Sequence, residues 1–172
     1  MIKECFAYSE QLEWSTVKAR AAQQGITIHL GSLLELCYEK GSELPPGHPD
    51  RKFKGRVVFL GDRVKDQYGA AAVFEELTSS PAGMEASKFA DVYKLFQGHV
   101  TQCSDAEQAY CQADMEGTET WVRVPADKRK PGCEHKFMVM PLRRALYGHP
   151  NSGSHWESKC NTDILSTGFE RI

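Results

Sequence analysis

The sequence has no long apolar run, no closely spaced cysteine pair and no strong excess of one charge. Its apolar stretches fall well short of the roughly 20 residues that a membrane-spanning helix needs. The N-terminal stretch, MIKECFAYSEQLEW, carries scattered charges in place of the apolar core of a signal peptide. These absences predict an intracellular protein, cytoplasmic or nuclear, that has no membrane partner.

The six cysteines never occur as a C-x-x-C pair, which is the usual spacing of a zinc finger. Free and mostly buried thiols in a reducing compartment are therefore expected. A zinc site assembled from distant positions, such as Cys133 and His135, is the alternative.

The formal net charge of −2 argues against a free-standing nucleic-acid clamp, which needs an overall basic surface to neutralise phosphates. Residues 50–65 differ from the rest, because they hold six basic residues against two acidic ones. This segment is the part of the chain that is expected to face phosphate. Its charged residues are Arg51, Lys52, Lys54, Arg56, Arg63 and Lys65, with Asp50 and Asp62.

The chain has 172 residues, of which 41% are hydrophobic, and this is enough for one domain with a buried core. Residues 9–25 predict a helix that begins near Ser9 and ends at Gly25. Residues 26–30 and 33–39 predict strands, although the second segment is also compatible with a helix. Residues 53–61 predict a further strand, which would form a hairpin with residues 33–39 across a long turn-rich connection.

The second half of the chain also contains both predicted helices and predicted strands. Residues 79–98 predict a helix whose aromatic stripe faces the core, followed by a short strand at 99–103. Residues 118–125 and 135–142 predict two more strands, and 152–169 a helix with a capping box at Ser154 and Glu157. The expected class is α+β, with antiparallel strands and packed helices.

Four blocks of sequence occur in a characteristic order: KGRVVFLGDRVKDQYG at residues 54–69, DAEQAYC at 105–111, TETWVRVP at 118–125 and LRRALYGHPNSGSHW at 142–156. Their order and spacing resemble the reverse transcriptase of copia-type LTR retrotransposons. That family carries K-A-R-L-V-A-x-G, D-V-x-x-A-F/Y-L, E-E-x-Y-M-x-x-P and L-x-K-A-L-Y-G-L-K-Q-x-P-R-x-W. The match runs from about Leu36 to Phe169.

The resemblance implies a partial fingers and palm of a right-hand RNA-directed DNA polymerase. Residues 32–172 would form this portion, incomplete at its C-terminus, and residues 1–31 a separate N-terminal helical or linker segment. The implied partners are an RNA/DNA template-primer and a deoxynucleoside triphosphate.

Asp105 and Tyr110 are the central site residues that the resemblance implies. A polymerase transfers nucleotides with two divalent ions, Mg²⁺ or Mn²⁺, which prefer hard oxygen ligands. Asp105 would be a catalytic metal ligand, and Tyr110 would pack under the sugar and exclude a 2′-hydroxyl. The alternative is local: Ser104 and Glu107 also form a capping-box pattern, in which Asp105 only favours the helix dipole.

Three further residues take roles from the same resemblance. Arg56 and Lys54 would meet the incoming triphosphate, and Asn151 stands where the family has a glutamine beside the nascent base pair. The alternatives are a solvated strand edge for the two basic residues and an ordinary turn for Asn151.

The sequence departs from the family in two places. Residues 149–154, HPNSGS, replace L-K-Q-x-P-R, and no pair of adjacent aspartates occurs, so the palm motif Y-V-D-D is missing. One aspartate offers too few oxygens for two metal ions. We therefore expect a reverse-transcriptase fragment that is inactive as an isolated chain and self-associates through uncovered palm surface. The alternative is a noncatalytic remnant that binds nucleic acid or a protein.

Overall fold

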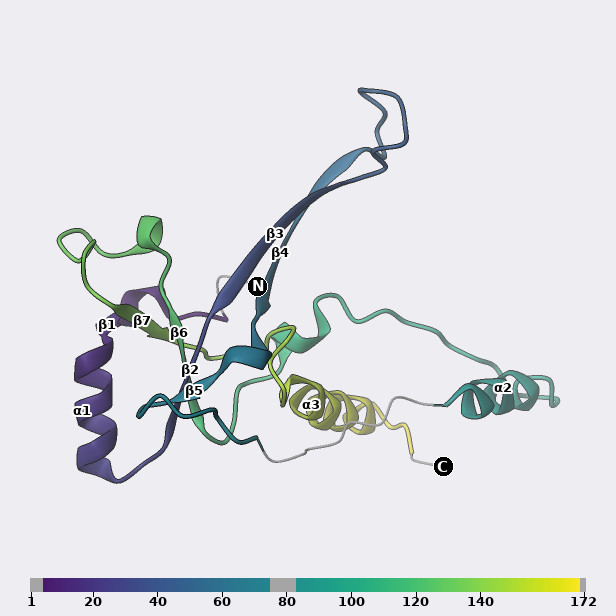
Figure 1. Ribbon diagram of the computed structural model, residues 1–172. Coiled ribbons are helices and arrows are strands. Elements are labelled where there is room, and N and C mark those ends of the chain that lie inside the picture. The colour runs from purple at the N-terminus through teal and green to yellow at the C-terminus, as the bar shows by residue number, and fades with distance from the viewer. Residues whose placement is uncertain (1–4, 75–82, 171–172) are drawn as a thin grey trace.

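The computed structural model describes residues 5–74 and 83–170, and these residues form a mixed α+β fold. Within them lie three α-helices, a five-stranded sheet and a separate two-stranded sheet (Figure 1). The expected α+β class is confirmed, whereas the arrangement of polymerase fingers and palm stays a prediction. No helix in the described ranges is long and apolar enough to cross a bilayer.

The larger sheet has the strand order β1-β7-β6-β2-β5. Strand β2 runs parallel to β6, and the other neighbouring pairs are antiparallel. The strands predicted at 26–30, 118–125 and 135–142 are confirmed as β2, β6 and β7. The bounds are Leu12–Glu13 for β1, Ile28–Gly31 for β2, Lys65–Asp66 for β5, Glu119–Arg123 for β6 and Met138–Pro141 for β7.

The segment before residue 32 contributes to this sheet directly. Strand β1 pairs with β7, and β2 lies between β6 and β5. Cys5 and Phe6 are buried with residues of the second half of the chain. Strands from both sides of the expected boundary at residues 31 and 32 thus share one sheet.

The second sheet is the predicted hairpin, formed by β3 at Leu33–Lys40 and β4 at Lys52–Phe59. Its antiparallel register runs from Leu33 opposite Phe59 to Lys40 opposite Lys52, and Figure 1 shows it projecting from the main sheet. The strand interpretation of residues 33–39 is therefore confirmed over the helical one.

An ion pair closes the outer end of the hairpin. The Arg51 guanidinium donates to both carboxylate oxygens of Glu39, at 2.6 and 3.0 Å, and to the Leu44 carbonyl at 3.1 Å. These hydrogen bonds from Arg51 hold the pKa of Glu39 below its usual value. Such a bidentate pair positions both side chains more firmly than a single surface contact does.

Helix α1, Trp14–Gln24, packs on one face of the main sheet. Val17 and Ala21 of the helix meet Ile28, Trp121 and Val139 of the strands. Gly25 ends the helix in the left-handed conformation (φ 65°), as predicted. The helix begins later than predicted, because residues 12–13 pair with β7 and Ser9 lies in a short 3-10 turn.

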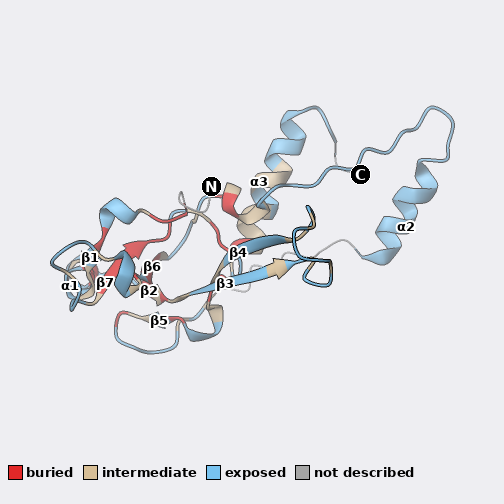
Figure 2. Cartoon of the chain, turned by 90° about the horizontal axis from the view of Figure 1, so that it is seen from above, coloured by how far each residue is buried: buried red, intermediate tan, exposed pale blue. Residues whose placement is uncertain are grey.

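The main core lies on the opposite face. Trp121 packs with α1 on one face of the sheet, and its neighbour Val122 belongs to the main core on the other face, because successive side chains of a strand point to opposite faces. Figure 2 shows the buried residues concentrated in the main sheet and at the base of the hairpin. The largest fully buried side chains of this cluster are Phe59, Met140, Leu146, Val122 and Val124.

Helix α2, Met84–Tyr93, lies apart from the sheets (Figure 1). The first residues of the predicted helix, 79–82, lie outside the described residues. The prediction that its aromatic stripe is core is wrong: Phe89 is 65% exposed, Tyr93 45% and Phe96 59%. The helical spacing was correct, but spacing shows only which side chains share a face, and no described segment covers this face.

The strand predicted at 99–103 is also wrong, because these residues have no strand partner and run as irregular chain towards Asp105. The capping-box alternative does not form either. A short 3-10 helix, Ala109–Gln112, begins later, after Gln108 in a left-handed conformation (φ 53°) and without a side-chain cap.

Helix α3, Ser152–Ser166, confirms the last predicted helix. The predicted capping box of Ser154 and Glu157 does not form. Asn151 is the N-cap residue, and the Ser154 hydroxyl donates to the Asn151 carbonyl at 2.8 Å. The remaining 3-10 turns are Tyr8–Glu10, Gly61–Arg63 and Ala126–Lys128.

The burial difference between two phenylalanines gives a test of the fold. Phe59→Ala should lower the free energy of unfolding by about 3–5 kcal/mol, because it leaves a cavity in the core. The matched Phe89→Ala should change it by less than about 0.5 kcal/mol, since that ring is exposed. Urea unfolding of both variants measures the two effects. A loss above about 2 kcal/mol for Phe89→Ala would show that α2 is covered in the folded protein.

Candidate functional site

A groove of about 520 Å³ lies between the inner half of β4 and the segment that leads into the 3-10 helix at residues 109–112. One wall comes from the hairpin, the other from residues 105–108, and the floor from Cys111, Leu146 and Tyr147. The groove brings together Lys54, Arg56 and Asp105, which the sequence analysis selected from distant blocks.

Lys54 and Arg56 reach the groove together because alternate residues of a strand share a face. They stand opposite Tyr38 and Leu36 of β3, and the Arg56 guanidinium lies 5.7 Å from the centre of the Tyr38 ring. Neither side chain has a carboxylate within ion-pair distance among the described residues. Both charges are therefore available to a ligand.

Two other basic residues of segment 50–65 are already paired. Arg51 binds Glu39 at the far end of the hairpin, and Arg63 lies 3.3 Å from Asp62. The positive charge that remains unpaired on β4 comes from Lys52, Lys54 and Arg56. Within the described residues, most of the unpaired positive charge of this segment thus lies on β4, with Lys65 on β5 as the remainder.

Asp105 and Glu107 supply the negative side of the groove. Asp105 is exposed and sits on irregular chain, not at the end of the rigid strand that a metal ligand of this type was expected to have. The groove consequently holds two acidic and two basic side chains.

A pair of tyrosines borders the floor. The rings of Tyr110 and Tyr147 have centroids 4.7 Å apart and planes tilted by 36°. Burial raises the pKa of Tyr147, and the negative charges of Cys111, Tyr110 and Asp105 act in the same direction while Arg56 opposes them. Tyr110 thereby adjoins the groove through Tyr147, a residue of the sequence block at 142–156.

The turn at residues 145–152 is docked on the end of β4. The Phe59 N–H donates to the Tyr147 carbonyl at 2.7 Å. Gly148 has φ +90°, and a Cβ there would overlap the Phe59 carbonyl oxygen, so only glycine fits. The Ser152 hydroxyl accepts from the Leu146 N–H at 3.0 Å and donates to the Leu146 carbonyl at 2.7 Å.

Cys111 is a groove residue that sequence analysis missed. A hydrogen bond with Cys5 lowers the pKa of the Cys111 thiol to about 7. Both thiols are buried, at 0% and 2% exposure. Nothing in the sequence indicates this pair, because the two cysteines are far apart along the chain and meet only through the fold.

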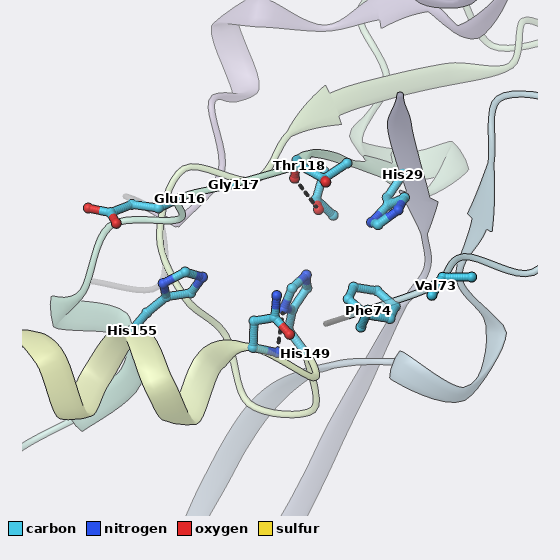
Figure 3. Close-up of a pocket in the computed structure, with 10 residues that line it drawn as sticks. His29, Val73, Phe74, Glu116, Gly117, Thr118, His149 and His155 are labelled. Atoms are coloured by element: carbon cyan, nitrogen blue, oxygen red, sulfur yellow. Dashed lines mark hydrogen bonds between the residues drawn. The ribbon is translucent and has the colours of Figure 1, made fainter. Parts of the chain in front are cut away.

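Asn151 is placed away from the groove. It lines a second pocket of about 360 Å³, together with His29, His149, His155 and Phe74. Figure 3 shows the three imidazole rings around this pocket, each from a different element. The resemblance implies no role for any of these histidines, although His149 and His155 lie within the block at residues 142–156.

The groove does not by itself provide the ligand set that two Mg²⁺ or Mn²⁺ ions require. The described residues contain no cluster of three or more His, Cys, Asp or Glu that could hold a metal ion. Asp105 and Glu107 are the carboxylates of the groove, whereas Mg²⁺ takes several oxygens in near-octahedral array. The role of Asp105 as a metal ligand stays a prediction.

Comparison of the chain with protein-family models, with curated proteins and with solved structures gives no match.

Proposed function

We propose that this chain is the nucleotide- and nucleic-acid-binding portion of a copia-type reverse transcriptase, and that the groove beside β4 is its phosphate-binding site. The observation that carries the proposal is the meeting of Lys54, Arg56 and Asp105 in one groove. Lys54 and Arg56 belong to the first block of the family pattern and Asp105 to the second, and the two blocks are far apart along the chain.

The chemistry of the groove suits phosphate on its hairpin side. The planar guanidinium of Arg56 matches phosphate oxygens, and Lys54 adds a second positive charge next to it. Tyr147 and Tyr110 provide a pair of tilted aromatic rings below, where a sugar or base finds an apolar contact. The proposal gives Asn151 no role at the groove, since it lines the other pocket.

Divalent ions, when bound, would lower the pKa of a primer hydroxyl and offset charge on the transferred phosphate. The proposal assigns Asp105 one coordinating carboxylate. The remaining ligands would have to come from outside the described residues, so a complete reaction is not assigned to this part of the chain.

The exposed hairpin favours a second candidate, binding of nucleic acid without catalysis. Phe53 is 75% exposed and Tyr38 43%, and both lie among the unpaired basic residues of the hairpin. Basic residues interleaved with exposed aromatic rings are typical of surfaces that track a single strand. The two candidates share the binding step and differ in whether chemistry follows.

Neutralising the groove should weaken binding of an RNA–DNA primer–template. Fluorescence anisotropy of the Lys54→Gln/Arg56→Gln double variant should give a Kd raised about tenfold at moderate salt. The slope of log affinity against log salt should fall by about 2, one for each lost phosphate contact.

The matched control is Lys18→Gln/Arg63→Gln, which removes the same charges from α1 and from the 3-10 turn after β4. It should leave the affinity within about twofold of the unaltered chain. Equal losses in both double variants would mean that binding follows net charge and not the groove.

Primer extension separates catalysis from binding. We expect no template-dependent incorporation by the purified chain with Mg²⁺ or Mn²⁺, because Asp105 supplies too few metal ligands. The assay is extension of a labelled primer, with Asp105→Asn as the comparison. Incorporation that Asp105→Asn abolishes would show that the chain is a working polymerase and would overturn this expectation.

A further inference from the structure

The second pocket contains buried imidazole nitrogens that have no hydrogen-bond partner. His29 and His149 are only 4% and 5% exposed, and His155 is half-buried. Among the described residues, no partner exists for His29 Nδ1, His149 Nε2 or His155 Nε2. A buried polar atom costs free energy unless protein, water or a ligand satisfies it, so three of them around one cavity mark the cavity as a candidate binding site.

The tautomer of His149 determines which kind of group its Nε2 can bind. Its Nδ1 accepts a hydrogen bond from the Asn151 N–H at 3.2 Å. A neutral imidazole that accepts at one nitrogen carries its proton on the other, so Nε2 presents an N–H donor to the pocket. The missing partner of His149 is therefore a hydrogen-bond acceptor.

The same geometry argues against a transition metal. A metal bound at His149 Nε2 would need the lone pair there, and Nδ1 would then carry a proton that faces the Asn151 N–H. The described part of the chain also shows no group of three metal-ligating side chains. An acceptor with several oxygens fits the donor better.

We propose that the pocket of His29, His149 and His155 binds a small oxyanion, a phosphate or a carboxylate, and takes up protons as it does so. The cavity of about 360 Å³ is ample for such an ion. Thr118 lies on the opposite side of the pocket from His149 in Figure 3, and Thr120 lines the pocket as well. The rings of His29 and His149 are held by Phe74, whose centroid lies 4.9 and 5.4 Å from theirs.

The charges around the pocket determine the sign of its pH dependence. Burial, followed by the charges of His155 and His29, lowers the pKa of His149 to about 4, and burial also lowers that of His29. An anion beside the rings would favour the charged form of His29 and raise its pKa, whereas His149 stays neutral because a proton on its Nδ1 would face the Asn151 N–H. Its affinity should therefore rise as the pH falls.

Two carboxylates act nearby. Asp66 on β5 favours the charged form of His29, and Glu116 lines the pocket. Figure 3 shows the Glu116 carboxylate directed away from His29 and His149, at the outer side of the pocket. No lysine or arginine lines the pocket within the described ranges, so the imidazoles themselves provide its positive charge.

Calorimetric titration of inorganic phosphate into the full chain tests the proposal. The Lys54→Gln/Arg56→Gln background removes phosphate binding at the groove, so failure of the proposed function leaves this test unaffected. Phosphate itself gains a proton over this range, so the pH dependence is measured with acetate, which stays ionised. At constant ionic strength, the acetate Kd should fall about tenfold or more between pH 7.5 and pH 5.5. Acetate in a parallel titration distinguishes a carboxylate site from a phosphate site.

Variants at two histidines locate the site. His155→Gln should weaken phosphate binding about fivefold or more at pH 5.5, while the matched His48→Gln in the hairpin connection should leave it unchanged. Imidazole ¹⁵N spectra of the chain with native histidines give a readout that needs no substitution in the core. Phosphate should shift the His149 and His29 ring resonances and not that of His48.

Absence of both phosphate and acetate binding at pH 5.5 would overturn the proposal. Equal losses from His155→Gln and His48→Gln would also overturn it, since binding would then not involve the pocket. Tight binding of Ni²⁺ that shifts the same ring resonances, with no response to either anion, would assign the histidines to a metal instead.

Discussion

The hydrogen bond from the Phe59 N–H to the Tyr147 carbonyl joins the base of the hairpin to the turn before α3, and both candidate sites depend on it. Tyr147 lines the groove beside β4, whereas His149, two residues later, lines the histidine pocket. The Phe59 ring lies 4.9 Å from the His149 ring, so one core residue contacts the turn through both its backbone and its side chain. Gly148 permits this contact because any larger residue would overlap the Phe59 backbone.

The same contact explains how distant residues form the groove. β4 is the strand that carries Lys54 and Arg56, and it ends at Phe59 in the core. The 3-10 helix at residues 109–112 is attached to the turn from the other side, since Ala145 N–H donates to the Ala113 carbonyl at 2.9 Å. Asp105 is therefore carried to the hairpin through this buried connection, and not by a strand of its own.

Paired and unpaired basic residues occupy different ends of the hairpin. Arg51 is used to close its outer end against Glu39, whereas Lys54 and Arg56 nearer the core have no carboxylate partner in the described chain. An ion pair at the tip maintains the strand register without neutralising the inner residues. The result is a projecting hairpin whose unpaired Lys54 and Arg56 lie beside the groove.

Local pattern determined much of the architecture by itself. Alternation and β-branched residues predicted β2, β3, β4, β6 and β7, and Gly25 predicted the end of α1, because these signals act within a few neighbouring residues. Lys54, Arg56 and Asp105, which the resemblance selected, line one groove, and their roles there stay predictions. Only the tertiary structure decided which apolar faces are covered: the stripe of Phe89 and Phe96 has helical spacing but no described partner. It also decided the meeting of Cys5 with Cys111 and of His29 with His149, since contacts between segments far apart in sequence arise from packing and leave no local periodicity.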